Sequence, residues 1–255
     1  MEKYKALMKL GVFSFEDLNA LYDNKNSASS AKKALLEKGL ITPVKRNLYV
    51  FNDIETNNPL ADRYKIGSSI TSGAYISHHS AMEFHGIAHQ VYFEVTVSSP
   101  TRFNPFEFNG IKYQFVMSKL NIGVETYSTN RGVRVTDLER TVIDCLNDIG
   151  RAGGIEELLE SLRVVTYLDE EKLLRYMKAY DTQVLYQKAG FILEQFKNEL
   201  QLSERFFEFC LTQLRQSKRY LTEQGDNNLV YNSKWRLYVP EDLFDYMEQG
   251  SEEFV

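Results

Sequence analysis

The sequence predicts an α+β protein in which a short basic module precedes a mixed α/β segment and a mainly helical C-terminal region. Strand-type spacing of apolar residues prevails in the middle of the chain, and helical spacing prevails after residue 149. Residues 1–52 hold nine Lys or Arg against five carboxylates, a net charge of +4, and the whole chain of 255 residues carries −5, so the remainder carries −9. A short positive module before an acidic body favours polyanion binding through that module, the alternative being a solvated charged surface.

Three helices are expected in the basic module. Residues 3–10 form a short amphipathic run that ends at Gly11. Ser14 begins an S-x-x-D capping box, in which its hydroxyl accepts from the amide of Asp17 and the Asp17 carboxylate reaches back, so a second helix runs to about residue 22. Turn residues follow, and Asn26 or Ser27 can cap a third helix that stops at Gly39.

A β-hairpin is expected over residues 40–51, with Lys45, Arg46 and Asn47 at its tip. Three short helices followed by a hairpin is the order of a winged helix-turn-helix, so residues 1–52 are predicted to be a winged-helix DNA-binding domain.

Helical geometry indicates which face of the third helix is free. Ala28, Ala31, Ala34 and Leu35 share the face that packs inward, which leaves a small basic face that fits the major groove of DNA. An alternative is that its lysines only solubilise the helix. The predicted DNA-binding residues are Ser29, Ser30, Lys32 and Lys33 on the helix and Lys45 and Arg46 on the wing.

A polar linker over residues 53–59 separates this module from a second domain over residues 60–255. Its mixed α/β part, about 60–148, is expected to hold strands at 74–77, 91–97, 112–117 and 124–128 and helices at 80–85 and 137–146, the last capped by Asp137. Its helical part, about 149–255, is expected to hold helices at 154–165, 169–180, 184–200 and 203–221 and a β pair at 228–232 and 234–239. An acidic run over 241–253 is read as a solvated terminal helix rather than an anionic docking surface.

Catalytic and metal-binding patterns are weak, so we expect no enzyme, no cofactor and no metal. Gly67 and Ser68 supply the phosphate-binding half of a nucleotidyltransferase motif, but no aspartate lies between Asp62 and Asp137 to hold Mg²⁺. No predicted strand carries an acidic-x-Lys nuclease pair, since Glu170-Glu171-Lys172 lies in a helical stretch. A Walker loop and a Rossmann glycine pattern are missing from the sequence. The four histidines, which could form a zinc site or a polar network, are His78, His79, His85 and His89.

Composition predicts a folded protein without a membrane segment, and a charged N-terminus without a signal-peptide core favours the cytoplasm. Cys145 and Cys210 lie in apolar helical patterns and are expected to be buried, inert thiols.

Four segments in this order resemble the AbiEi family of bacterial antitoxins: GLITPVKRNLYV at 39–50, YISHHSAMEFHG at 75–86, RVTDLERTVIDC at 134–145 and WRLYV at 235–239. Asn47 stands where many members have a glycine, and Asn adopts the same left-handed turn. The resemblance implies the antitoxin of a type IV toxin-antitoxin system of abortive infection, a phage defence. It implies a repressor of its own operon that binds inverted repeats in double-stranded promoter DNA through the winged helix. It also implies a C-terminal domain that counteracts a nucleotidyltransferase toxin without a stable complex.

The rival interpretation is a winged-helix regulator fused to a ligand-sensing or degenerate nuclease domain, with the histidine cluster as its site. Metal-dependent DNA cleavage would separate the two interpretations.

Overall fold

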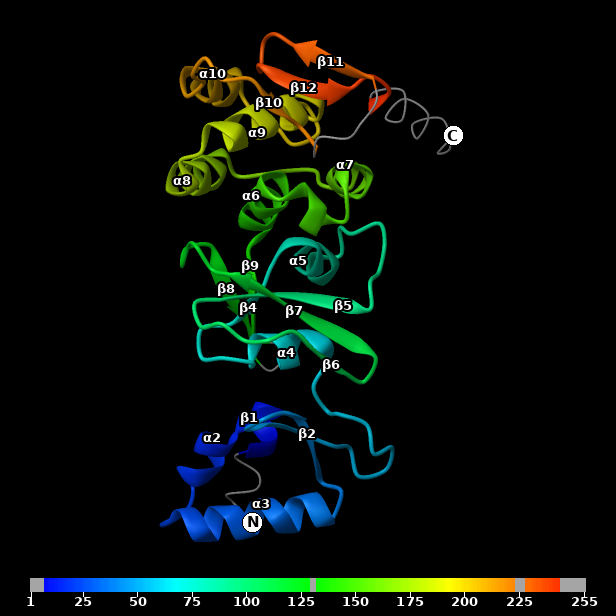
Figure 1. The fold of residues 1–255 in the computed structure, drawn as a ribbon, viewed down its shortest axis with the longest axis vertical. Coiled ribbons are helices and arrows are strands. Elements are labelled where there is room, and N and C mark those ends of the chain that lie inside the picture. Colours follow the sequence, from blue (N-terminus) through cyan, green and yellow to red (C-terminus); the bar gives the residue numbers. More distant parts are fainter. Residues whose placement is uncertain (1–6, 129–131, 223–227, 244–255) are drawn as a thin grey trace. The chain divides into compact units, whose positions relative to one another are not determined.

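The computed structural model describes residues 7–128, 132–222 and 228–243 and shows an α+β protein, as predicted (Figure 1). The chain divides into two compact units. The first comprises residues 1–80, 92–119 and 124–136, and the second comprises 81–91, 120–123 and 137–255. Residues 7–10 of the predicted first helix are helical, whereas residues 3–6 and most of the acidic run at 241–253 lie outside the described residues. Within the described ranges no helix combines the length and apolarity that a membrane span requires.

The N-terminal module of unit 1 combines helices with a three-stranded antiparallel sheet of order β1-β3-β2. Phe13, Phe51, Leu18 and Ala28 form its core at 0–1% exposure, and the rings of Phe13 and Phe51 lie 5.1 Å apart. The predicted hairpin is confirmed. Its elements are β1 (Val12–Ser14), α2 (Phe15–Asn19), α3 (Lys25–Glu37), β2 (Ile41–Lys45) and β3 (Leu48–Phe51).

Local capping chemistry sets the helix boundaries of this module. The predicted capping box is confirmed: the amide of Asp17 donates to Ser14 Oγ at 3.0 Å, and the amide of Ser14 donates to Asp17 Oδ2 at 2.7 Å. The prediction of Asn26 or Ser27 as cap of α3 was wrong, because Asn24 Oδ1 accepts the amide of Ser27 at 2.9 Å and starts the helix two residues earlier. Gly39 ends the helix with φ +65°, as expected.

The segment after β3 is ordered by its own turn. Asp53 Oδ1 accepts the amides of Glu55 and Thr56, and the amide of Leu60 donates to the carbonyl of Phe51 at 2.7 Å. Residues 53–59, predicted as a linker, therefore form a defined turn.

The rest of unit 1 is built around a six-stranded mixed sheet of order β6-β7-β5-β4-β9-β8, with parallel pairs β5–β7 and β4–β9. Gly67 lets α4 lie directly on this sheet, because a Cβ there would be 2.8 Å from Ile76 Cδ1 and 3.2 Å from Val95 Cγ1. The strands are β4 (Tyr75–Ile76), β5 (Glu94–Ser99), β6 (Phe106–Phe108), β7 (Ile111–Met117), β8 (Val124–Tyr127) and β9 (Val133–Thr136). The helices that begin in this unit are α4 (Arg63–Ser68) and α5 (His78–His85).

The sequence predicted four of these six strands, and it missed β6, β9 and helix α4. The missed elements are short, with three residues in β6, four in β9 and six in α4, so each carries little periodicity. Length alone does not explain the misses, because β4 and β8 have only two and four residues and were predicted. The predicted strand at 91–97 begins only at residue 94.

Unit 2 is an array of helices followed by a small sheet of order β10-β12-β11 (Figure 1). Asp137 Oδ1 accepts the amide of Arg140 at 2.8 Å and caps α6, as the sequence predicted. Asp169 caps α8 in the same way. The helices are α6 (Leu138–Asn147), the 3-10 turn η2 (Ile149–Ala152), α7 (Ile155–Arg163), α8 (Glu170–Tyr180), α9 (Gln183–Gln195) and α10 (Glu204–Thr212). The strands are β10 (Arg219–Tyr220), β11 (Leu229–Asn232) and β12 (Leu237–Pro240).

The prediction of a helix to residue 221 was wrong, because α10 ends at Thr212 and the chain turns into β10. Long-range hydrogen bonds hold this segment: Gln183 Nε2 and Gln187 Nε2 both donate to the carbonyl of Ser217, at 2.8 Å and 3.2 Å. Such partners lie about 30 residues or more away and leave no local trace in the sequence.

The core of unit 2 closes around Trp235, which is fully buried. Its indole N–H donates to Glu194 Oε2 at 2.9 Å, and its ring lies on the backbone of α9 at Gly190. Cys145 and Cys210 are buried free thiols, as predicted, and burial raises the pKa of both.

Candidate nucleic-acid interface

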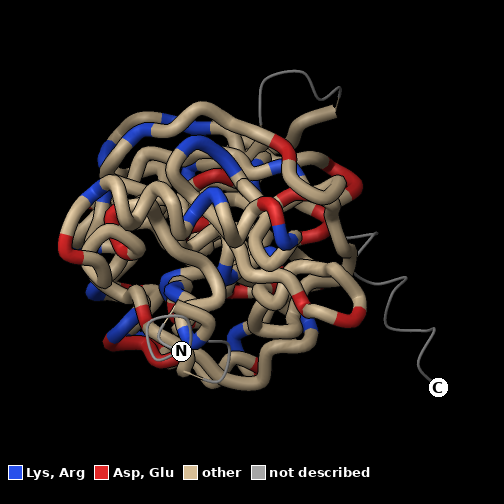
Figure 2. The backbone as a smooth tube through the Cα atoms, turned by 90° about the horizontal axis from the view of Figure 1, so that it is seen from below, with Lys and Arg blue, Asp and Glu red and all other residues tan. Residues whose placement is uncertain are grey.

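Basic and acidic positions lie close together along the backbone tube in Figure 2, so net charge alone does not define a binding surface. The candidate residues of α3 differ in exposure. Ala28 is buried, Ser29 is half-buried, and Ser30 and Lys33 are exposed. The Lys33 side chain is 77% exposed and its Nζ lies 3.8 Å from Glu37 Oε1. A surface pair at that distance is weak, so the Lys33 ammonium can exchange Glu37 for a phosphate.

Lys32 lies at the edge of the same helix against two aromatic rings. Its Nζ is 5.1 Å from the centroid of the Phe15 ring and 5.9 Å from that of Tyr49. The alkyl stem therefore covers apolar surface while the residue remains half-exposed. The Lys33 side chain therefore projects from α3 into solvent, whereas the Lys32 side chain lies along the edge of the helix against Phe15 and Tyr49.

The two basic residues of the hairpin tip have different surroundings. Asn47 takes φ +63°, the left-handed conformation expected at this position, and Arg46 is exposed beside it. Lys45 is half-buried, with Nζ 5.0 Å from the centroid of Phe103 and 5.3 Å from that of Phe106, and burial lowers its pKa. Of the two predicted wing contacts, only Arg46 projects freely into solvent.

The two histidines of unit 1 are both buried, and His78 belongs to a hydroxyl network. His78 has φ +53° and places Nδ1 2.9 Å from Ser77 Oγ, which in turn lies 2.7 Å from Ser98 Oγ. His79 stacks on Tyr92 with ring centroids 4.2 Å apart. Both histidines are at most 6% exposed, which gives them roles in packing and hydrogen bonding.

In unit 2, His89 lies with Nδ1 3.9 Å from Glu157 Oε2, and the amide of His89 donates to Glu157 Oε1 at 2.9 Å. The His85 ring meets Phe84 edge-on. Across the described residues no group of three or more His, Cys, Asp or Glu is placed to hold a metal ion. The expectation that the histidines bind no functional metal stays a prediction.

A buried polar network at the start of α6 was not anticipated from the sequence. Arg140, 1% exposed, donates from Nε to Asp144 Oδ1 at 2.6 Å and from Nη1 to the carbonyl of Ile122 at 2.6 Å. Tyr180 donates to the same Asp144 oxygen at 2.6 Å. The signal in the sequence was the placement of opposite charges at i and i+4, Arg140 and Asp144, beside the apolar residues of one helix. Arg140 and Asp144 form a buried ion pair, so removing either side chain would leave the other charge buried without its partner.

The Tyr176 hydroxyl extends this network by donating to Asp137 Oδ2 at 2.6 Å. Lys172 Nζ lies 3.1 Å from Glu139 Oε2 and 3.4 Å from Asp137 Oδ2. Desolvation lowers the pKa of Lys172, but its hydrogen bonds to these carboxylates outweigh that effect and raise the pKa.

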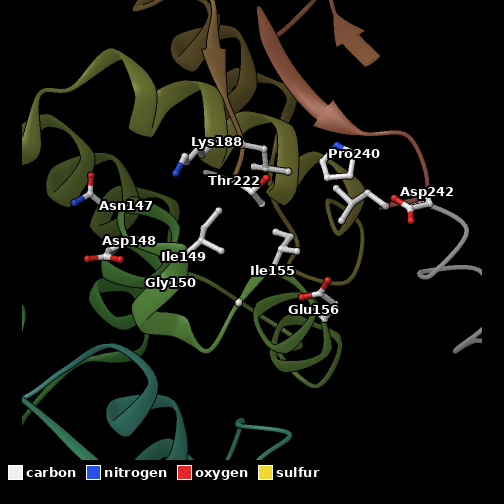
Figure 3. A pocket seen from close by; sticks show the side chains of 13 residues that line it. Asn147, Asp148, Ile149, Gly150, Ile155, Glu156, Lys188, Thr222, Pro240 and Asp242 are labelled. Carbon is white, nitrogen blue, oxygen red and sulfur yellow. The ribbon is translucent and has the colours of Figure 1, made fainter. Parts of the chain in front are cut away.

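A cavity of about 630 Å³ lies in unit 2 between η2, the start of α7 and the small sheet (Figure 3). Lys188 reaches into it from α9, on the side where Asn147 and Asp148 lie, and burial lowers the Lys188 pKa although Asp148 opposes the shift. Three carboxylates line the same cavity: Asp148, Glu156 and Asp242. An anion would meet one cation and three negative charges there, so the cavity suits a neutral polar molecule or water better than a phosphate.

Comparison with known proteins gives a likeness of fold only. No family model and no curated protein matches the chain. The structure is similar to the crystal structure of the RV2827C protein from Mycobacterium tuberculosis, with a TM-score of 0.64 and 14% sequence identity, over 94% of this chain and 89% of that one. The two chains therefore share an architecture along most of their length.

Proposed function

We propose that the protein is a DNA-binding repressor of its own operon and the antitoxin of a bicistronic toxin-antitoxin system, and that it is not an enzyme. One observation supports the DNA-binding part of this proposal: in the N-terminal module, Ser30 and Lys33 are exposed on α3, and Arg46 is exposed at the tip of the β2–β3 hairpin that follows it. Its helices and three-stranded sheet support a winged helix-turn-helix.

In this proposal α3 enters the major groove of promoter DNA. The helix has 13 residues and is about 20 Å long, and a groove about 12 Å wide admits it. Ser29 and Ser30 near its N-terminal half come close to base edges, Lys32 and Lys33 reach phosphates, and Arg46 contacts the neighbouring backbone or minor groove. Lys45, which lies against Phe103 and Phe106, holds the hairpin in place instead of contacting DNA.

The antitoxin half rests on the resemblance to the AbiEi family, whose members counteract a nucleotidyltransferase toxin without a stable complex. One observation supports placing this chain outside the transferase class. Gly67 and Ser68, the residues that could have formed a phosphate-binding turn, lie buried inside α4, where Gly67 packs on the sheet. The two residues thus belong to a helix that packs on the sheet, whereas a phosphate-binding turn is an open loop.

The DNA-binding half is tested by titrating the protein with its own promoter fragment over a range of salt concentrations. Replacing Arg46 with alanine removes one phosphate contact, so the slope of log K against log salt should flatten by about one. Lys112→Ala is the matched control, because it removes the same charge from an exposed position on β7, and it should leave that slope within about 0.3 of the wild-type value. Equal slopes for Arg46→Ala and wild type would contradict the proposed role of the hairpin tip.

A further inference from the structure

The outward face of the small sheet in unit 2 carries a row of three tyrosines. Tyr220 on β10 and Tyr231 on β11 both pair with Tyr238 on β12, so their side chains lie on one face. Each outer ring is 5.1 Å from the Tyr238 ring, centroid to centroid. Leu237 and Val239 alternate with Tyr238 and are buried, which places the tyrosine row on the solvent side. Tyr220 and Tyr231 are 37% and 39% exposed.

The segment that forms this small sheet is rich in basic residues although the C-terminal region as a whole is acidic. Residues 149–255 hold 13 basic and 19 acidic residues. Five of the basic residues fall within 215–236, and only Glu223 and Asp226 of the acidic ones do. The five are Arg215, Lys218, Arg219, Lys234 and Arg236.

Three of these cations are free to bind a ligand. Arg215, Lys218 and Arg219 are exposed, and among the described residues none of them forms an ion pair. Lys218 Nζ lies 4.6 Å from the centroid of the Tyr231 ring, on the tyrosine row itself. Lys234, by contrast, is paired with Glu194.

A hollow of about 370 Å³ adjoins the segment that carries these cations. Arg215 and Arg219 line it together with amide and hydroxyl side chains, and Asp181 is its only carboxylate among the described residues. Gln183 donates to the carbonyl of Ser217 and accepts from the Ser217 hydroxyl at 3.0 Å, so the non-helical segment before β10 is held in place. Two arginines at the rim of a polar hollow suit the bidentate recognition of a phosphate.

We propose that the face formed by the tyrosine row and Lys218 binds single-stranded RNA. Arg219 pairs with Leu237, so its side chain leaves the edge strand β10 on the opposite face, where it lines the polar hollow with Arg215 and can contact phosphates that pass over the edge of the sheet. Aromatic side chains on a sheet stack on unpaired bases, and neighbouring Arg and Lys follow the phosphates. A duplex keeps its bases stacked inside and would leave the tyrosines without partners. Cellular DNA is mostly duplex, whereas RNA presents unpaired bases, so RNA is the polymer that fits. This inference does not depend on DNA binding by the N-terminal module.

The test measures fluorescence anisotropy of a labelled mixed-sequence RNA 12-mer with the full-length protein. Lys218→Ala combined with Arg219→Ala should flatten the slope of log K against log salt by about 1.4, since each phosphate contact to a single strand contributes about 0.7. Arg175→Ala combined with Arg205→Ala removes the same charge from exposed positions on α8 and α10 and should leave the slope unchanged. Equal effects of the two double variants would overturn the proposal.

The tyrosine row is tested separately from the charges. Tyr220→Ala should weaken RNA binding about tenfold, and Tyr220→Phe, which keeps the ring, should stay within about twofold of wild type. Equal affinities of the two variants would overturn stacking, as would equal affinity for the RNA duplex of the same sequence. A single-stranded DNA 12-mer that binds as tightly as the RNA would overturn the assignment to RNA.

Two controls keep the result interpretable. Emission from Trp235, the single tryptophan, reports whether the sheet remains packed on α9 in each variant. The variant Lys33→Ala, Arg46→Ala should lose promoter binding but keep RNA binding. If it loses both, the RNA site lies on the N-terminal module and the proposal fails, whereas retained promoter binding with normal RNA binding contradicts only the proposed repressor function.

Discussion

At the scale of single residues, Gly190 and Trp235 approach each other so closely that no larger residue fits at position 190 without movement of the indole. A Cβ at position 190 would lie 2.0 Å from Cζ3 and 2.3 Å from Cη2 of the indole. Alanine is the better helix former by about 1 kcal/mol, yet overpacking a buried site costs about 1–3 kcal/mol or more. Here the obstacle is a rigid ring that is fully buried, so the steric effect should dominate.

We therefore expect Gly190→Ala to lower the free energy of unfolding by about 2 kcal/mol and to shift Trp235 emission to longer wavelength. Urea denaturation followed by tryptophan fluorescence measures both. Gly150→Ala in the same unit is the control, since its nearest neighbour would be Asp148 Oδ1 at an ordinary 3.6 Å. A Gly190→Ala protein as stable as wild type would show that Trp235 can move away from α9.

Two tyrosines, buried Tyr176 and half-buried Tyr180, make unit 2 sensitive to alkaline pH. Burial, followed by the nearby carboxylates Asp137 and Asp144, raises the pKa of Tyr176 and Tyr180 above the ordinary value near 10. The unfolded chain loses these protons first, so stability should be unaffected below about pH 10. Above it, stability should fall by up to about 1.4 kcal/mol per pH unit for each tyrosine until the folded pKa is reached.

Tyr180→Phe should make this decline shallower between about pH 10 and 11.5, because one of the two tyrosines no longer ionises on unfolding. At neutral pH the same variant should be less stable by about 1–3 kcal/mol, since it leaves Asp144 without one of its donors. The free energy of unfolding measured against pH tests both statements. Tyr167→Phe, at a residue that is 54% exposed, should match the wild-type curve.

At the scale of elements, the start of α3 decides how the proposed recognition helix is presented. Asn24 caps the helix from outside, whereas Asn26 lies in its first turn and is exposed. Asn24→Ala should therefore destabilise the protein by about 1 kcal/mol, as loss of an N-cap does, and Asn26→Ala should have almost no effect. Thermal unfolding of Asn24→Ala and Asn26→Ala compares the two candidate caps directly. If Asn26→Ala were the more destabilising variant, Asn26 would be the cap, as the sequence alone suggested.

Elements with a strong local signal were predictable. Capping by Ser14 and Asp137, the helix stop at Gly39 and the hairpin at 40–51 depend on neighbours in the sequence, and the structure contains all of them. Strands such as β1 and β10 are two or three residues long and exist through pairing with distant strands. The segment that follows α10 is likewise held by Gln183 of α9, which donates to the carbonyl of Ser217, and no local sequence pattern indicates that contact.

The candidate site was predictable in composition but not in geometry. Residue spacing identified a helix and a hairpin with basic positions, and both elements are present. Spacing could not distinguish Lys45 from Arg46, because the half-buried setting of Lys45 comes from Phe103 and Phe106, more than 50 residues away. The tyrosine row was hidden for the same reason, since it forms only when three strands pair.

At the scale of the whole molecule, residues 1–52 carry a net charge of +4 and the remainder carries −9. Under the proposed function, repression and antitoxicity should therefore be separable. Lys32→Ala combined with Lys33→Ala removes two positive charges from α3, and neither residue belongs to a core cluster. That protein should lose repression of its own promoter, measured with a reporter. It should still rescue cells that express the partner toxin from an unrelated promoter, where transcriptional control of the toxin is excluded by design. Loss of rescue in a protein shown by circular dichroism to be folded, and present at normal abundance, would mean that nucleic-acid binding by the N-terminal module is itself part of the antitoxic mechanism.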